Sequence, residues 1–124
     1  MGPDVNSHVK SDAEIASKHD VATWSVDLST RQVTRSENHD AMFGYAVNLP
    51  HWNIEHFLAH VHPADASMFT ATFRNAVELN ENFDFAFRVK WPDGSEHRLR
   101  TAGSITFSEE GKPQAVFGST QFAS

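Results

Sequence analysis

The first clear pattern along the chain is an alternation of apolar and polar residues. Residues 21–28 (VATWSVDL) carry an apolar side chain at every second position from Trp24 to Leu28. Residues two apart point to the same face of a β-strand, so this segment predicts a strand with one buried face. A Ser-Thr turn follows, and residues 32–36 return as a second strand. The pattern therefore begins with a β-hairpin.

The next segment, residues 38–58, has no long period. Gly44 and Pro50 interrupt it, and aromatic residues are scattered through it. We expect two short helices in this part of the chain, over residues 40–43 and 53–61. Short helices that carry aromatic residues often form one wall of a pocket.

The longest helix is predicted over residues 63–80. Pro63 suits the first helical position, where a missing N–H costs nothing. Asp65 lies in the first turn, where the helix dipole favours a negative charge. Apolar residues follow at helical spacing on one face, namely Phe69, Phe73, Ala76 and Val77.

After this helix the period returns to two. Residues 83–91 alternate five apolar residues with other side chains: Phe83, Phe85, Phe87, Val89 and Trp91. Turns over residues 92–95 and 110–113 separate two further strands, over residues 96–107 and 114–122. This order predicts an α+β fold, in which short helices and one long helix cover one face of a single five-stranded antiparallel sheet.

The N-terminus stands apart from this pattern. Residues 1–20 are expected to hold a leader and a flanking helix over residues 9–19, where Ser11 and Glu14 have the spacing of a capping box. The apolar face of this helix is too thin to fold alone, so it would pack on the domain or on a second copy. We place the folded domain at residues 21–124.

Composition narrows the class of protein. The chain has 124 residues, of which 40% are hydrophobic and 21% charged, as in a single globular domain. A net charge of −6 argues against nucleic acid as a general partner. There is no apolar run long enough for a membrane span and no secretion signal, so we expect a cytoplasmic protein.

An ordered set of short motifs resembles a known family, the PAS domains, in the subclass found in bacterial histidine kinases and cyclic-dinucleotide signalling proteins. The resemblance covers about Ala22 to Gln121. Each motif is weak alone, but the set in this order is specific. The motifs are Trp24-Ser25-Val26-Asp27, Met42-Phe43-Gly44-Tyr45, Val61-His62-Pro63-Ala64-Asp65, Phe87-Arg88, Asp93-Gly94, Gly111-Lys112-Pro113 and Phe117-Gly118-Ser119-Thr120-Gln121.

Two positions depart from the family pattern. Arg98 stands where the penultimate strand usually has a tryptophan. Phe122 stands where the family usually has the aspartate that begins the linker to an output domain. The second departure puts signal output through that junction in question.

The resemblance implies a sensory or interaction module of signal transduction and no enzyme. It also implies a homodimer through the N-terminal helix and the outer face of the sheet, together with an output domain or partner protein. The outer face is expected to carry Thr101, Ser104, Thr106, Ser119 and Gln121. A ligand would signal by favouring one of two dimer packings.

The ligand-binding residues are expected where the aromatic stripes meet between the helices and the sheet. A small apolar pocket there would be lined by Trp24, Phe43, Phe57, Phe69, Phe73, Phe85 and Phe87, with Arg98 as a polar group if it points inward. The alternative is a core that these rings fill completely. In that case the domain would be a ligand-free interaction module.

Histidines suggest a further alternative. His56 and His60 are four residues apart and share a helix face, a spacing that suits a metal ion, or haem on one axial histidine. We expect no metal site, because such rings often simply cap or cover helices, and haem stays open as the basis of a gas or redox sensor. The chain has no cysteine, so a cysteine-adduct flavin is excluded. The cofactor is otherwise unknown, and no catalytic motif is present.

Overall fold

The computed structural model of the protein describes residues 20–123. The elements follow the predicted order: β1 (Val21–Asp27), β2 (Val33–Arg35), η1 (Asp40–Phe43), α3 (Ile54–His60), α4 (Pro63–Leu79), β3 (Phe83–Lys90), β4 (Glu96–Phe107) and β5 (Pro113–Phe122). The predicted leader and flanking helix, residues 1–20, lie outside the described residues except for residue 20.

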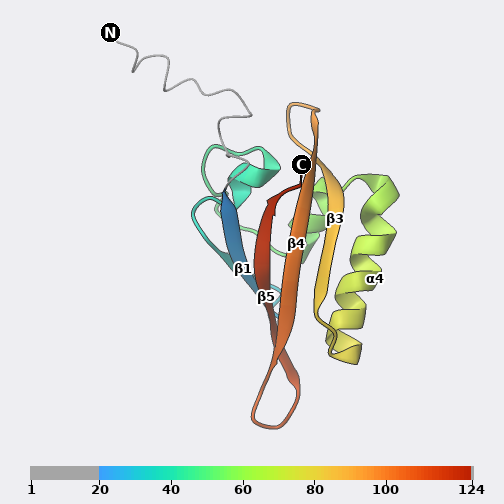
Figure 1. Ribbon diagram of the computed structural model, residues 1–124. Helices are drawn as coiled ribbons and strands as arrows, with labels where there is room; N and C mark the ends of the chain where they lie inside the picture. Colours follow the sequence, from blue (N-terminus) through green and yellow to red (C-terminus); the bar gives the residue numbers. More distant parts are fainter. Residues whose placement is uncertain (1–19, 124) are drawn as a thin grey trace.

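The five strands form one antiparallel sheet in the order β2-β1-β5-β4-β3 (Figure 1). The first and last strands of the chain, β1 and β5, are therefore neighbours, with Val21 opposite Gln121. The hairpin between β4 and β5 extends beyond the helices at one end of the molecule. The predicted α+β class with a five-stranded antiparallel sheet is confirmed.

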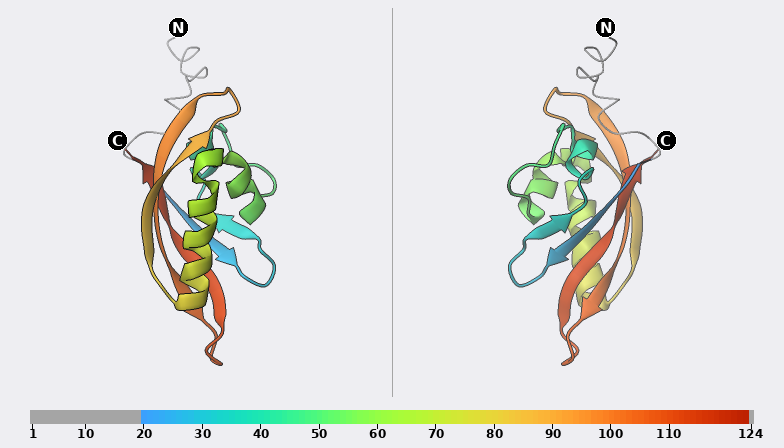
Figure 2. Two further views of the ribbon diagram at one scale, coloured as in Figure 1. Left: turned by 90° about the vertical axis from the view of Figure 1, so that its right-hand side faces the viewer. Right: turned by 90° about the vertical axis from the view of Figure 1, so that its left-hand side faces the viewer.

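All the described helices lie on one face of the curved sheet (Figure 2). Local signals set where they begin and end. Asn53 and His56 form a reciprocal capping box at the start of α3. The ring of His62 caps α4, which begins at Pro63 and is followed by Asn80 as its C-cap in the left-handed conformation (φ 53°). Within residues 20–123, no helix is long and apolar enough to cross a membrane.

Period-two alternation decides which strand residues enter the core. On β4 the inward positions are Leu99, which is fully buried, and Thr101, which is 5% exposed. The expectation that Thr101 lies on the outer face is wrong. The strand has mostly small polar residues in this stretch, so its own composition did not reveal which face was buried. Of the other residues expected there, Thr106 and Gln121 are exposed, and Ser104 and Ser119 are partly so.

Candidate ligand cavity between the sheet and the helices

A small cavity lies in the aromatic core between α4, α3 and the sheet. Its volume is about 20 Å³, which is close to the room that one water molecule needs. Its wall consists of seven aromatic rings and two threonines: Trp24, Phe57, Phe69, Phe73, Phe83, Phe85, Phe87, Thr101 and Thr120. Most of the space that the rings enclose is therefore filled by the rings themselves.

Six of the eight residues expected to bind a ligand line this cavity, namely Trp24, Phe57, Phe69, Phe73, Phe85 and Phe87. Phe43 does not line it: it is fully buried behind Phe57, with the ring centroids 5.8 Å apart. Arg98 lies on the exposed face of β4, opposite Arg88 of β3, and is also absent from the wall. An inward-pointing Arg98 is therefore not observed, because its position in the strand alternates with the buried Leu99.

The wall is built from two regular spacings. Phe83, Phe85 and Phe87 point inward from alternate positions of β3, and Phe69 and Phe73 stand four residues apart on α4. The two sets meet edge to face, with Phe69 5.0 Å from Phe87 between ring centroids. This geometry is favourable for aromatic pairs and holds the helix against the sheet.

A pair of glycines makes room for the rings on the sheet side. Gly103 and Gly118 lie opposite each other on β4 and β5. A Cβ on Gly103 would come within 2.5 Å of the Phe83 ring, and one on Gly118 within 2.9 Å of the Trp24 ring. Trp24 and Phe83 stack with their centroids 6.1 Å apart, and the glycine pair allows this close approach.

The polar part of the wall is a chain of three hydrogen bonds. The indole N–H of Trp24 donates to Thr120 Oγ1 (3.0 Å), the Thr120 hydroxyl donates to Thr101 Oγ1 (3.0 Å), and the Thr101 hydroxyl donates to the Ser119 carbonyl (2.9 Å). Both threonines are buried. Every proton in this chain therefore has an acceptor, as buried polar groups require.

Sequence reasoning missed three residues of the wall. Phe83 belongs to the same alternation as Phe85 and Phe87, so its inward position was already implied by the pattern. Thr101 and Thr120 carried no such signal, because threonine is as common on the outer face of a sheet as on the inner one. Only their pairing across β4 and β5 brings them together.

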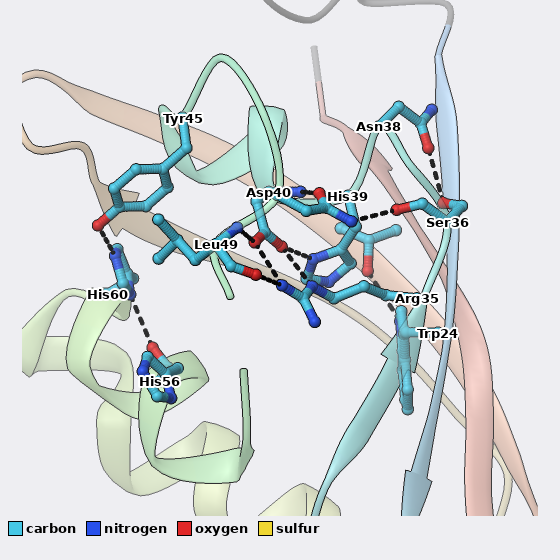
Figure 3. A network of polar contacts seen from close by, with 12 residues as sticks. Trp24, Arg35, Ser36, Asn38, His39, Asp40, Tyr45, Leu49, His56 and His60 are labelled. Atoms are coloured by element: carbon cyan, nitrogen blue, oxygen red, sulfur yellow. Dashed lines mark hydrogen bonds and ion pairs between the residues drawn. The ribbon is translucent and has the colours of Figure 1, made fainter. Parts of the chain in front are cut away.

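A second buried cluster lies beside the cavity, around the fully buried Asp40 (Figure 3). Its carboxylate accepts two hydrogen bonds from Arg35 (both 2.8 Å) and one from the Leu49 N–H (2.7 Å), and Nδ1 of His39 lies 2.7 Å from it. Burial alone would raise the pKa of Asp40, but the bonds from His39, Arg35 and Leu49 outweigh it and bring the pKa to about 2.

His39 is the least solvated histidine that the structure describes. It is fully buried, and its ring lies against Phe43, Trp52 and Phe57. Burial lowers its pKa, against the opposing pull of Asp40. A neutral ring that donates from Nδ1 to Asp40 has a bare Nε2, and this atom has no hydrogen-bond partner in the structure.

The two histidines singled out for metal or haem lie together on α3, beside this cluster (Figure 3). Both rings stack on Trp52, with centroids 5.4 Å away for His56 and 5.2 Å for His60. In His60, Nε2 is bonded to the Tyr45 hydroxyl and Nδ1 to the His56 carbonyl, both at 2.7 Å (Figure 3). In His56, Nδ1 belongs to the cap of α3. A metal or haem iron at His60 would have to displace one of its two bonds, whereas in His56 the Nε2 atom takes no part in the cap.

No group of three or more residues suited to metal binding occurs among the described residues. Of the other nearby residues with ligand-type side chains, His51 is exposed, and the ring of His62 caps α4. Asp65 instead holds Arg88 through both carboxylate oxygens.

Comparison with known proteins places the fold. A family model described as "PAS fold" matches residues 32–120. No curated protein matches the chain by sequence. Solved structures do match, among them the N-terminal domain of a diguanylate cyclase with PAS/PAC sensor from Marinobacter aquaeolei, with a TM-score of 0.76 at 15% identity. That match covers 83% of this chain and 94% of the other.

Two further structures have the same architecture. A sensory box histidine kinase/response regulator from Burkholderia thailandensis E264 matches with a TM-score of 0.71 at 20% identity, over 83% of this chain and 76% of the other. A PAS domain from Colwellia psychrerythraea matches with a TM-score of 0.63 at 15% identity, over 96% of each chain. At these identities the likeness concerns the fold alone.

Proposed function

Because this chain belongs to the PAS family, a family of sensory domains found in signalling proteins, we propose that it receives its signal as a small ligand in the aromatic cavity. The observation that carries this proposal is the cavity itself, which lies between α4 and the sheet and has a wall of aromatic rings. Pockets for small ligands are typically apolar with few polar groups, and this wall has only Thr101, Thr120 and the Trp24 indole as its polar members.

The size of the cavity sets how a ligand would act. Since about 20 Å³ is free, any ligand larger than a water molecule has to move rings of the wall. Phe73 and Phe85 are the partly exposed rings, whereas Phe57, Phe69, Phe83 and Phe87 are buried. We therefore expect entry past Phe73 and Phe85. A ligand signals only if it binds one of two conformations more tightly than the other. A ligand that moves α4 relative to the sheet would meet this condition.

The proposal is tested by native mass spectrometry of the purified chain, followed by denaturation and identification of any released small molecule. A ligand in the cavity appears as a mass adduct that is lost when Thr101→Leu adds bulk to the wall. A chain that never carries or acquires an adduct would favour the filled-core interaction module. An absorption band typical of haem in the same preparation would support the gas or redox sensor instead.

Dimerisation is the second candidate function, and exposed apolar residues on the outer sheet face support it. Phe117 of β5 is 45% exposed and Val21 of β1 is 49% exposed, on adjacent strands of the open face. The occupant that we propose is a second copy of the chain, because the start of β1 and the end of β5 lie together at Val21 and the predicted flanking helix leads into β1. We also propose that the domain acts on an output domain or partner protein, and that the protein is cytoplasmic.

Light scattering coupled to gel filtration tests the dimer. Phe117→Glu should convert a dimer into a monomer, since a buried unpaired charge is costly at an interface. Glu110→Gln, in the turn between β4 and β5, is the matched surface control and should leave the mass unchanged. A wild-type chain that runs as a monomer at all concentrations would overturn the dimer.

A further inference from the structure

We propose that the ligand of the aromatic cavity is a neutral molecule with an apolar body whose polar group donates a hydrogen bond to Thr101 or Thr120. This inference rests on the function proposed above and adds the chemical class of ligand. It is carried by the direction of the hydrogen bonds in the wall.

The direction of that chain is fixed at both ends. The indole N–H of Trp24 can only donate, so Thr120 Oγ1 must accept from it. The Ser119 carbonyl at the other end can only accept, so the Thr101 hydroxyl donates to it. Between these ends the Thr120 hydroxyl donates to Thr101 Oγ1. All three protons are therefore committed.

Each threonine oxygen keeps one lone pair, because a hydroxyl oxygen accepts two hydrogen bonds and each has accepted one. The remaining side chains of the wall are phenylalanines. The wall therefore offers two acceptors, no free donor and no charged group. A ligand whose polar atom only accepts would be buried without a partner, whereas an N–H or O–H group would gain one.

A charged ligand does not suit this wall either. Burying an ion requires a counterion or several donors, and the charges of Asp40 and Asp65 are already paired, with Arg35 and Arg88 respectively. Neither pair includes a residue of the wall. This excludes carboxylates and phosphates as the class of ligand.

Three bicyclic probes of nearly equal shape separate the possibilities: indole has an N–H donor, indene has no polar group, and benzofuran has only an acceptor. We would titrate each into the full chain and into its Phe73→Ala variant, which opens the wall at a partly exposed ring. Amide shifts in two-dimensional NMR give the Kd. Indole should bind about tenfold more tightly than indene or benzofuran, as expected for one buried hydrogen bond.

Thr101→Val in the Phe73→Ala background tests the role of the hydroxyl chain. It removes one acceptor and frees the Thr120 proton, which has lost its partner. The preference for indole over benzofuran should therefore shrink or reverse. Thr106→Val is the matched control, because Thr106 lies on the same strand with an exposed side chain outside the cavity. It should leave the preference unchanged. If Phe73→Ala does not fold, Phe85→Ala opens the wall from β3.

The outcomes separate the two proposals. If all three probes bind with equal Kd, or if Thr101→Val leaves the preference for indole intact, the donor inference is wrong while the cavity remains a binding site. If neither the full chain nor either opened variant binds any probe, the ligand-binding function fails, and the donor inference fails with it.

Discussion

At the scale of single residues, the most constrained side chain is the buried carboxylate of Asp40. A buried charge is tolerated only where it is paired and hydrogen-bonded, and Arg35, His39 and the Leu49 N–H satisfy that condition. The same cluster fixes the tautomer of His39, because the ionised Asp40 needs a donor at Nδ1. His39 and Asp40 are adjacent in the sequence, and the charge of Asp40 is balanced by Arg35, five residues upstream.

The neutral state of His39 predicts how stability depends on pH. Its folded pKa lies below the ordinary value of 6.5, so the unfolded chain binds the proton more readily. The contribution of His39 to stability is therefore complete above about pH 6.5 and is lost as the pH falls below it. Asp40 and Arg35 are the charged groups that act on the ring.

His39→Phe keeps an aromatic ring beside Phe43 and Trp52 but removes the titration. We expect the fall in Tm between pH 7 and pH 5 to be shallower in this variant than in the wild type, measured by circular dichroism. Burial also lowers the pKa of His97, so part of the slope should remain. His51→Gln, at an exposed position, is the control. Equal slopes for His39→Phe and wild type would contradict the prediction.

At the scale of elements, one ion pair joins the start of α4 to β3. Both carboxylate oxygens of Asp65 bind the Arg88 guanidinium, at 2.8 and 3.0 Å, and one also accepts from the Arg88 backbone N–H at 2.8 Å. The side-chain bond and then the backbone bond from Arg88 lower the pKa of Asp65 to about 2. The pair holds the helix in place over the strand that carries Phe83, Phe85 and Phe87.

Asp65→Asn should lower the Tm at pH 7 by on the order of 5 °C, because the substitution removes the negative charge of the carboxylate that accepts the Arg88 hydrogen bonds. The folded pKa is depressed, so the contribution is complete above pH 3.8 and is lost as the pH falls through about 2. The difference in Tm between variant and wild type should therefore narrow below pH 3.8.

Asp84→Asn is the matched control for that variant. Asp84 and Arg100 form the same two-bond geometry on the outer face, but both side chains are about half exposed. Exposed ion pairs contribute little, so the Tm should barely change. If the two variants lost equal stability, the link between α4 and β3 would have no special role.

At the scale of the whole molecule, the cavity lies close to the place where the chain enters and leaves the sheet. Thr120 of the wall is opposite Ala22 on β1, and the next pair is Val21 with Gln121 (Figure 1). Phe122, at the position where the family usually has an aspartate, instead packs near Trp91 and His97, with centroid distances of 6.4 Å to each. A ligand beside Thr120 would therefore lie two residues before the end of β5 and next to the start of β1.

This arrangement predicts which backbone amides change their chemical shifts when a ligand binds. When indole saturates the Phe73→Ala variant, the amides of Val21 and Gln121 should shift more than those of Phe107 and Lys112, which lie at the far end of the β4–β5 hairpin. The same NMR titration gives the measurement. Larger shifts at the hairpin tip than at Val21 and Gln121 would contradict the prediction that a ligand in the cavity acts on the start of β1 and the end of β5.

The sequence by itself determined the elements and their order. The period of two in residues 83–91, the helical spacing of Phe69 and Phe73, and Pro63 at the first helical position act over short distances, so they are readable without the fold. The same spacings predicted most of the aromatic wall of the cavity. The motifs then identified the family.

Only the tertiary structure decided what depends on contacts between distant segments. The inward position of Thr101 and Thr120 follows from the pairing of β4 with β5, and the direction of their hydrogen bonds follows from Trp24, 96 residues away from Thr120. The size of the cavity depends on how rings from four elements fill one space. Such packing has no local signal, because the same aromatic residues would serve equally in a filled core.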